Sequence, residues 1–174
     1  MALPLRLLEC NNDETLAVTG GAGTLALSAA RALLEHGASS VVLFDLESTL
    51  QTSRDSINAL EADFPSARII KKAVDVTDAT AVDEAFAAVR DELKTIDILV
   101  CFAGIVGCVH SMETTAAQWR KTIDVNTTGS FLCAQAAAKR MSAQGTGGSI
   151  VLTASISAHR VNFPQPQAAY MTTK

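Results

Sequence analysis

Short apolar runs alternate with helix-like stretches along most of the chain. The apolar runs lie at residues 15–20, 40–45, 67–76, 96–104 and 148–154. The fourth, "IDILVCFAG", is nearly continuous, as in strands that are buried on both faces. The stretches between the runs are long enough to bring each strand back in the same direction. The alternation therefore predicts an α/β fold, a Rossmann-type doubly wound parallel sheet of about five strands.

Helical periodicity and terminal signals mark the connecting segments. Gly37 follows the first periodic stretch as a C-terminal stop, and Asp78 precedes the third as an N-cap. The expected helices cover residues 24–36, 48–63, 78–94 and 114–143.

Composition and charge exclude several classes of protein. Apolar residues make up 48% of the 174 residues and charged residues 18%, which is the balance of a folded chain. The net charge is −4 and the 14 basic residues are scattered, so no nucleic-acid partner is expected. No run approaches the ~18 apolar residues of a membrane span, and no membrane partner is expected either.

The remaining features set the domain limits and the redox setting. Residues 1–14 are expected to form a poorly ordered leader, and residues 15–174 a single doubly wound domain. The three histidines and four cysteines show no ligand spacing, so no metal site is predicted. Cys101 and Cys133 lie in apolar runs, which favours buried, reduced thiols and a cytoplasmic protein.

A glycine-rich turn joins the first strand to the first helix in "VTGGAGTLAL". Gly21, Gly23 and Ala26 satisfy G-x-G-x-x-A. Alternatively, Thr19 and Gly20 begin a T-G-x-x-x-G-x-G pattern with Thr24 and Ala26 at its later glycines. Either alignment places a pyrophosphate against free amides at a helix N-terminus. The candidate cofactor contacts here are Gly20, Gly21, Gly23, Thr24 and Leu25.

Asp45 ends the second strand, 22 residues after Gly23. An acidic residue at about this distance accepts hydrogen bonds from the adenosine ribose and repels a 2′-phosphate. Asp45 therefore favours NAD, and NADP is not excluded.

These motifs together resemble the short-chain dehydrogenase/reductase family. The matching pieces are "VTGGAGTLA", "FDLE", "DVTD", "ILVCFAG", "DVNTTGSFL", "GSIVLTAS" and "YMTTK", in the family's order from Thr15 to Lys174. The resemblance implies the family's Rossmann fold, without the strands and helices that follow the lysine in its members. It also implies a homo-oligomer, with the usual interface helix incomplete here.

The resemblance implies further cofactor contacts. Asp75 and Val76 match the pair beside the adenine, and Ala103 and Gly104 match the turn beneath the cofactor. Where the family carries two asparagines before that turn, this chain has Cys101 and Phe102, so polar contacts that stabilise the sheet are expected to be missing.

The resemblance also implies a catalytic set. Its members are Asn126, Ser155, Tyr170 and Lys174, of which Asn126, Tyr170 and Lys174 also contact the cofactor. The commonest spacing to the tyrosine selects Ser157 as the serine, whereas alignment of the fifth strand selects Ser155. We prefer Ser155, because strands fix geometry and loops absorb insertions.

The implied reaction is hydride transfer between NAD(P)(H) and a small-molecule carbonyl or secondary alcohol. The loop "HRVNFPQPQ" resembles that of fungal polyol and sugar members such as mannitol dehydrogenase and sorbose or xylulose reductases, which suggests a polyol or sugar. A chain that ends on Lys174 is expected to bind NAD weakly and turn over little. The alternative is a non-catalytic NAD-binding module or pseudoenzyme fragment.

Overall fold

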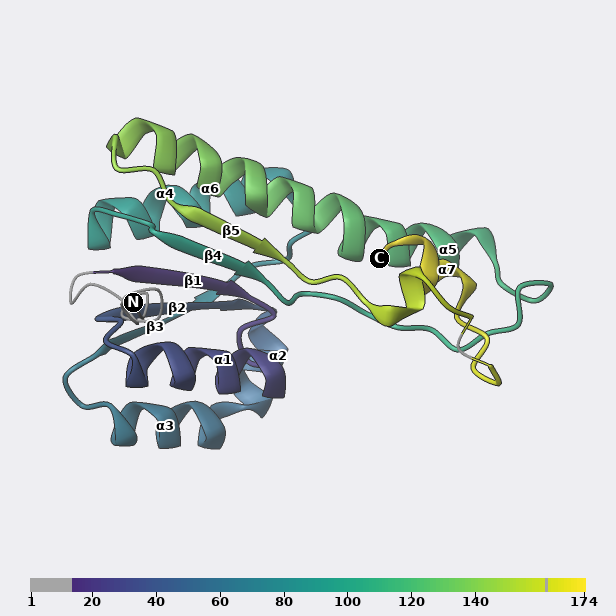
Figure 1. Ribbon diagram of the computed structural model, residues 1–174, viewed down its shortest axis with the longest axis horizontal. Helices are drawn as coiled ribbons and strands as arrows, with labels where there is room; N and C mark the ends of the chain where they lie inside the picture. Colours follow the sequence, from purple (N-terminus) through teal and green to yellow (C-terminus); the bar gives the residue numbers. More distant parts are fainter. Residues whose placement is uncertain (1–13, 162) are drawn as a thin grey trace, which may run out of the picture.

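The fold is built on one parallel sheet with the strand order β3-β2-β1-β4-β5 (Figure 1). The computed structural model describes residues 14–161 and 163–174, so the expected leader, Glu14 apart, lies outside the described residues. The strands are β1 (Thr15–Thr19), β2 (Ser40–Asp45), β3 (Arg68–Ala73), β4 (Ile98–Cys101) and β5 (Ser149–Leu152). All four neighbouring pairs are parallel. The predicted doubly wound sheet is confirmed.

Helices connect successive strands and cover both faces of the sheet (Figure 1). They are α1 (Thr24–Glu35), α2 (Glu47–Thr52), α3 (Arg54–Asp63), α4 (Ala79–Leu93), α5 (Ala116–Ile123), α6 (Ser130–Gln144) and α7 (Ala168–Thr172). A π-helical turn, η2 (Asp124–Gly129), joins α5 to α6, and a 3-10 turn, η3 (Ile156–Ala158), follows β5. Helices α1 and α3 cover one face, while α4 and α6 cover the other.

Alternation along the buried strands divides the core into two clusters. Along β1, Leu16 and Val18 point toward the face covered by α1 and α3, while Ala17 points toward α4 and α6. All three side chains are fully buried. The central strands are apolar on both faces because both faces carry helices.

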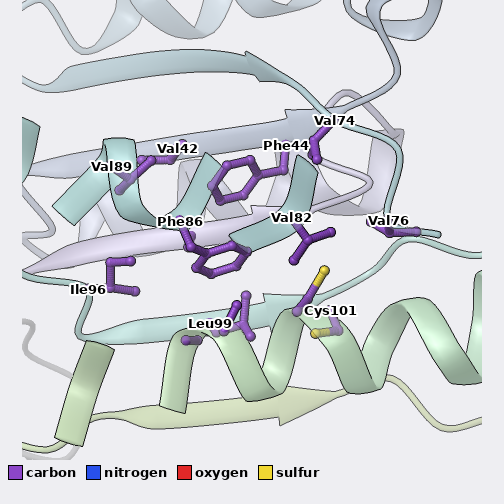
Figure 2. Packing of buried hydrophobic residues seen from close by; sticks show 14 of the residues in the cluster. Val42, Phe44, Val74, Val76, Val82, Phe86, Val89, Ile96, Leu99 and Cys101 are labelled. Carbon is purple, nitrogen blue, oxygen red and sulfur yellow. The ribbon is translucent and has the colours of Figure 1, made fainter. Parts of the chain in front are cut away.

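An aromatic pair anchors the cluster beneath α4 (Figure 2). The rings of Phe44 on β2 and Phe86 on α4 are stacked, with their centroids 4.8 Å apart. Phe86 leaves 1% of its surface exposed. This pair packs β2 against α4, the helix that precedes β4 in the chain.

The predicted helical stretch over 114–143 is confirmed, since α5, η2 and α6 follow one another without a break over residues 116–144. Its middle turn, η2, is π-helical, and there Asn126 binds the backbone of Ile105. Such a tertiary bond leaves no mark on apolar periodicity. The helix predicted over 48–63, by contrast, divides at Ser53, which lies outside both α2 and α3.

The strand β5 forms an edge of the sheet, with β4 as its one neighbour. Ile150, Val151 and Leu152 are 38–59% exposed, in contrast to the fully buried β1. Within the described residues, β5 is thus an exposed edge of the sheet. Across residues 14–161 and 163–174, no helix combines the length and apolarity needed to cross a membrane.

Replacing Phe86 with alanine tests the role of the aromatic pair. We expect Phe86→Ala to lower the free energy of unfolding by about 3–5 kcal/mol, because a buried phenyl ring is lost and a cavity remains. Urea denaturation followed by circular dichroism measures this change. The matched control is Phe131→Ala on α6, where the ring is 60% exposed, and a loss of similar size there would contradict the assignment.

Candidate functional site

A cleft opens at the carboxyl ends of the strands, where the direction of winding reverses. The chain winds outward from β1 through β2 to β3, and α4 then carries it back so that β4 pairs with the other side of β1. The loops after β1 and β4 therefore separate, and such switch points hold ligands in open α/β sheets. The cleft has a volume of about 740 Å³ and is lined by the turns after β1, β2, β3 and β4 and by α5.

The glycine turn allows β1 and β4 to approach each other closely. Gly20 has a φ of +64°, and a Cβ on it would stand 2.8 Å from the backbone nitrogen of Ala103. A Cβ on Gly21 would stand 2.7 Å from the Cα of Leu43 on β2. Any larger residue would collide with backbone on either side. Gly20 and Gly23 thus leave bare backbone in the wall of the cleft, as close approach to a phosphate requires.

The carboxylate of Asp45 lies in the cleft and ties β2 to the glycine turn. Its Oδ2 accepts a hydrogen bond from the backbone nitrogen of Ala22 at 3.1 Å, and its Oδ1 accepts one from Leu46 at 2.8 Å. A carboxylate has about four acceptor sites, so capacity remains for hydroxyl donors. The position predicted from spacing is one that can meet a ribose.

The other cofactor candidates divide into two groups. Asp75, Val76, Ala103 and Gly104 line the cleft together with Gly20, Gly23 and Asp45. Gly21 is buried behind the turn, while Thr24 and Leu25 are exposed on the first turn of α1, outside the lining of the cleft.

Threonine hydroxyls connect the strands where the family carries asparagines. The hydroxyl of Thr19 accepts a hydrogen bond from the backbone nitrogen of Ala103 at 3.2 Å. That of Thr153 donates to the carbonyl of Cys101 at 2.7 Å. These bonds join β1, β4 and the end of β5, so polar contacts remain despite the substitution. The thiol of Cys101 is an inert part of the core, since burial raises its pKa to about 11.

Asn126 is buried in the π-helical turn, with 3% of its surface exposed. Its Oδ1 accepts from the backbone nitrogen of Ile105 at 2.8 Å, and its Nδ2 donates to the carbonyl of Ile105 at 2.9 Å. The same Nδ2 donates to the hydroxyl of Thr173 at 3.0 Å. The side chain therefore joins the loop after β4 to the segment that carries Tyr170 and Lys174. Single-turn π-helical bulges are frequent at functional sites.

The two candidate serines differ in exposure. Ser157 is 3% exposed in η3, whereas Ser155 is half-buried just before it. The Ser155 hydroxyl accepts from the backbone nitrogen of Ser157 at 3.1 Å. Ser155 is the more exposed of the two residues, and the backbone of the turn holds its hydroxyl in place.

Tyr170 and Lys174 lie at the C-terminal end of the chain, beside η3 and α5 (Figure 1). The Lys174 Nζ stands 5.7 Å from the centre of the Tyr170 ring and donates to the carbonyl of Thr153 at 2.8 Å. Thr153 precedes Ser155 by two residues. Thr173 thus links Asn126 to the backbone of Tyr170. The bond from Lys174 to Thr153 links Lys174 to the segment that carries Ser155.

The list of candidate residues drawn from the sequence omits several residues of the site. Thr19 and Thr173 supply hydroxyls that hold backbone and side chains. Arg120 and Lys121 of α5 add positive charge to the wall of the cleft. The position of Thr173, directly before Lys174, could have indicated its part in the site. No feature of the sequence indicated that α5 would turn Arg120 and Lys121 toward the cleft. Among the described residues, no group of three or more histidine, cysteine or acidic side chains could hold a metal ion.

Comparisons with known proteins agree with this arrangement. Residues 14–174 match the family profile described as short chain dehydrogenase. The D-arabinitol 2-dehydrogenase (ribulose-forming) of Candida albicans is 34% identical over 171 residues, which cover 94% of this chain and 61% of that protein.

Two solved structures are also similar. An NAD⁺-bound xylitol dehydrogenase is 28% identical with a TM-score of 0.80, covering 94% of this chain and 60% of that one. The NADPH-dependent 3-quinuclidinone reductase from Rhodotorula rubra is 30% identical with a TM-score of 0.79, covering 92% of this chain and 59% of that one. The chain thus spans about three fifths of the length of these relatives.

Two glycine substitutions test the close approach at the turn. We expect Gly20→Ala to lower the free energy of unfolding by about 2 kcal/mol or more, because it combines an unfavourable φ with a backbone collision. Gly107→Ala is the control, since a Cβ there meets nothing within 4 Å, and it should change stability by less than about 0.5 kcal/mol. Equal effects of the two variants in urea denaturation would refute the close contact.

Proposed function

The chain belongs to the short-chain dehydrogenase family, and on this premise we propose that it carries the machinery for hydride transfer between NAD and a carbonyl or secondary alcohol. One observation carries the proposal. The cleft of the glycine turn and the segment of Tyr170 and Lys174 lie at the same end of the sheet, joined through Asn126 and its bonds to Ile105 and Thr173. A dinucleotide in the cleft would therefore have its reactive end near the tyrosine.

The chain's own groups fit a dinucleotide. Because Gly20 and Gly23 have no side chains, the pyrophosphate could lie close to the backbone at the start of α1. The helix dipole favours an anion there. Asp45 would accept from the ribose hydroxyls of the adenosine. Asp75 and Val76 would border the adenine, with Ala103 and Gly104 beneath the dinucleotide. When bound, the nicotinamide supplies the hydride acceptor or donor.

The catalytic residues would handle the proton. The Tyr170 hydroxyl would give a proton to the substrate oxygen or take one from it, and Ser155 would hydrogen-bond the same oxygen. The Lys174 ammonium, 5.7 Å from the tyrosine ring, would stabilise negative charge on the phenolate oxygen. Only one of the three donors of this ammonium is used by Thr153, so others remain for a ribose.

The proposed substrates are polyols and the corresponding ketoses. The names of two relatives support this class, a D-arabinitol dehydrogenase and a xylitol dehydrogenase. Other relatives carry other names, among them a quinuclidinone reductase. The substrate class is accordingly best tested with a panel that contains both ketoses and 3-quinuclidinone.

A reducing, cytoplasmic setting is part of the proposal. Cys101, Cys108 and Cys133 are free thiols, and the first and third are buried. Burial raises the pKa of Cys133 to about 12, which suits an unreactive core thiol. Free thiols persist where the compartment keeps cysteines reduced.

The carboxylate of Asp45 should set the choice of cofactor. We expect Asp45→Asn to weaken NADH binding about tenfold and to narrow its advantage over NADPH, because charged hydrogen bonds are lost and a 2′-phosphate is no longer repelled. Isothermal titration calorimetry with both cofactors measures this. Glu47→Gln is the control, since it removes the same charge from an exposed position in α2. An unchanged NADH to NADPH ratio in Asp45→Asn would refute the assignment.

Transfer of deuterium from NADH deuterated at C4 tests the reaction itself. We expect labelled alcohol from a ketose such as D-ribulose, and at least about a hundredfold less from Tyr170→Phe, because the proton donor is lost. Mass spectrometry detects the label even when turnover is slow. NADH binding without any label in the product would favour the non-catalytic alternative.

A further inference from the structure

Thr173 lies between the two elements of the proposed catalytic set. Its Oγ1 accepts a hydrogen bond from the Nδ2 of Asn126 at 3.0 Å and donates one to the carbonyl of Tyr170 at 2.7 Å. A carbonyl can only accept, so the single proton of the hydroxyl is committed to Tyr170. The hydroxyl thus joins the buried asparagine to the backbone of the tyrosine through two bonds of fixed direction.

The orientation of the Asn126 amide is also determined by its surroundings. The backbone nitrogen of Ile105 requires an acceptor, which is Oδ1 at 2.8 Å, and the Ile105 carbonyl requires a donor, which is Nδ2 at 2.9 Å. A flipped amide would lose both bonds. The second hydrogen of Nδ2 consequently points toward Thr173. Because Asn126 is 97% buried, water is not available to replace this partner.

Helix α7, which carries Tyr170, is held in place by tertiary contacts with α5 and η3. Two side-chain links hold its C-terminal turn from different sides, Thr173 to Asn126 and Lys174 to the carbonyl of Thr153.

We propose that Thr173 is a positioning residue, whose hydroxyl fixes Tyr170 relative to the π-helical turn of Asn126. Thr173 does not belong to the lining of the cleft, so its role is assigned through Tyr170. The proposal deepens the function proposed above and rests on the role given there to Tyr170. Its structural part, the position of the tyrosine ring, can be measured without any reaction.

Three substitutions isolate the hydroxyl. Thr173→Val keeps the shape of the side chain and removes both hydrogen bonds, whereas Thr173→Ser keeps the hydroxyl. Thr172→Val is the matched control, because the Thr172 hydroxyl donates to the Ala168 carbonyl at 3.0 Å in the same helix but is exposed and has no bond to Asn126.

NMR spectroscopy of the 174-residue protein provides the readout. Tyr170 is the only tyrosine of the chain, so its ring signals are assigned without ambiguity in a sample labelled at tyrosine. We expect Thr173→Val to shift or broaden these signals and those of the Asn126 side-chain amide. Thr173→Ser should restore them, and Thr172→Val should leave them as in the unsubstituted protein. The rate of deuteride transfer should fall on the order of tenfold in Thr173→Val, since a buried donor loses its partner.

Tyrosine signals in Thr173→Val that coincide with those of the unsubstituted protein would overturn the proposal. If Thr173→Val does not fold, an NOE between the Asn126 amide and the Thr173 side chain in the unsubstituted protein decides the matter, and its absence overturns the proposal. The two hypotheses fail separately. Shifted tyrosine signals without deuteride transfer in any variant would support the positioning role and refute the reaction, while full transfer in Thr173→Val would refute the positioning role alone.

Discussion

The close contact between the turn after β1 and the turn after β4 determines the rest of the site. At Gly20 and Ala103 the two backbones approach so closely that no Cβ fits between them. This approach sets the floor of the cleft at the switch point of the sheet. It also places the exposed backbone of Gly23 at the start of α1, beside the Asp45 carboxylate. A steric constraint and an electrostatic preference for anions thus meet at one end of the sheet.

A second set of contacts extends the site from the sheet to the end of the chain. Asn126 binds the backbone of Ile105 beyond β4, and through Thr173 it reaches the short helix of Tyr170. Lys174 reaches the end of β5 through Thr153. None of these bonds lies within a long regular element. The proposed catalytic residues are therefore held by a few hydrogen bonds between buried or half-buried groups, which makes their arrangement sensitive to small substitutions.

The strands, the glycine turn and Asp45 could be predicted because their causes are local. Continuous apolar runs between helical stretches specify buried strands. A glycine-rich turn after a strand specifies close approach of the backbone. The π-helical turn at Asn126 could not be predicted, because the bonds of Asn126 go to the backbone of Ile105, 21 residues away. The compensation of the missing asparagines by Thr19 and Thr153 likewise depends on which strands are neighbours. Thr24 and Leu25 were expected at the cofactor, yet the structure places both outside the lining of the cleft.

The central claim is that a dinucleotide bound in the cleft brings its nicotinamide to Tyr170. Nuclear Overhauser effects between bound NAD⁺ and protein labelled at its only tyrosine measure this directly. We expect contacts from the nicotinamide protons to the Tyr170 ring and none from the adenine protons. Bound NAD⁺ that gave adenine contacts to Tyr170, or no tyrosine contacts at all, would contradict the claim.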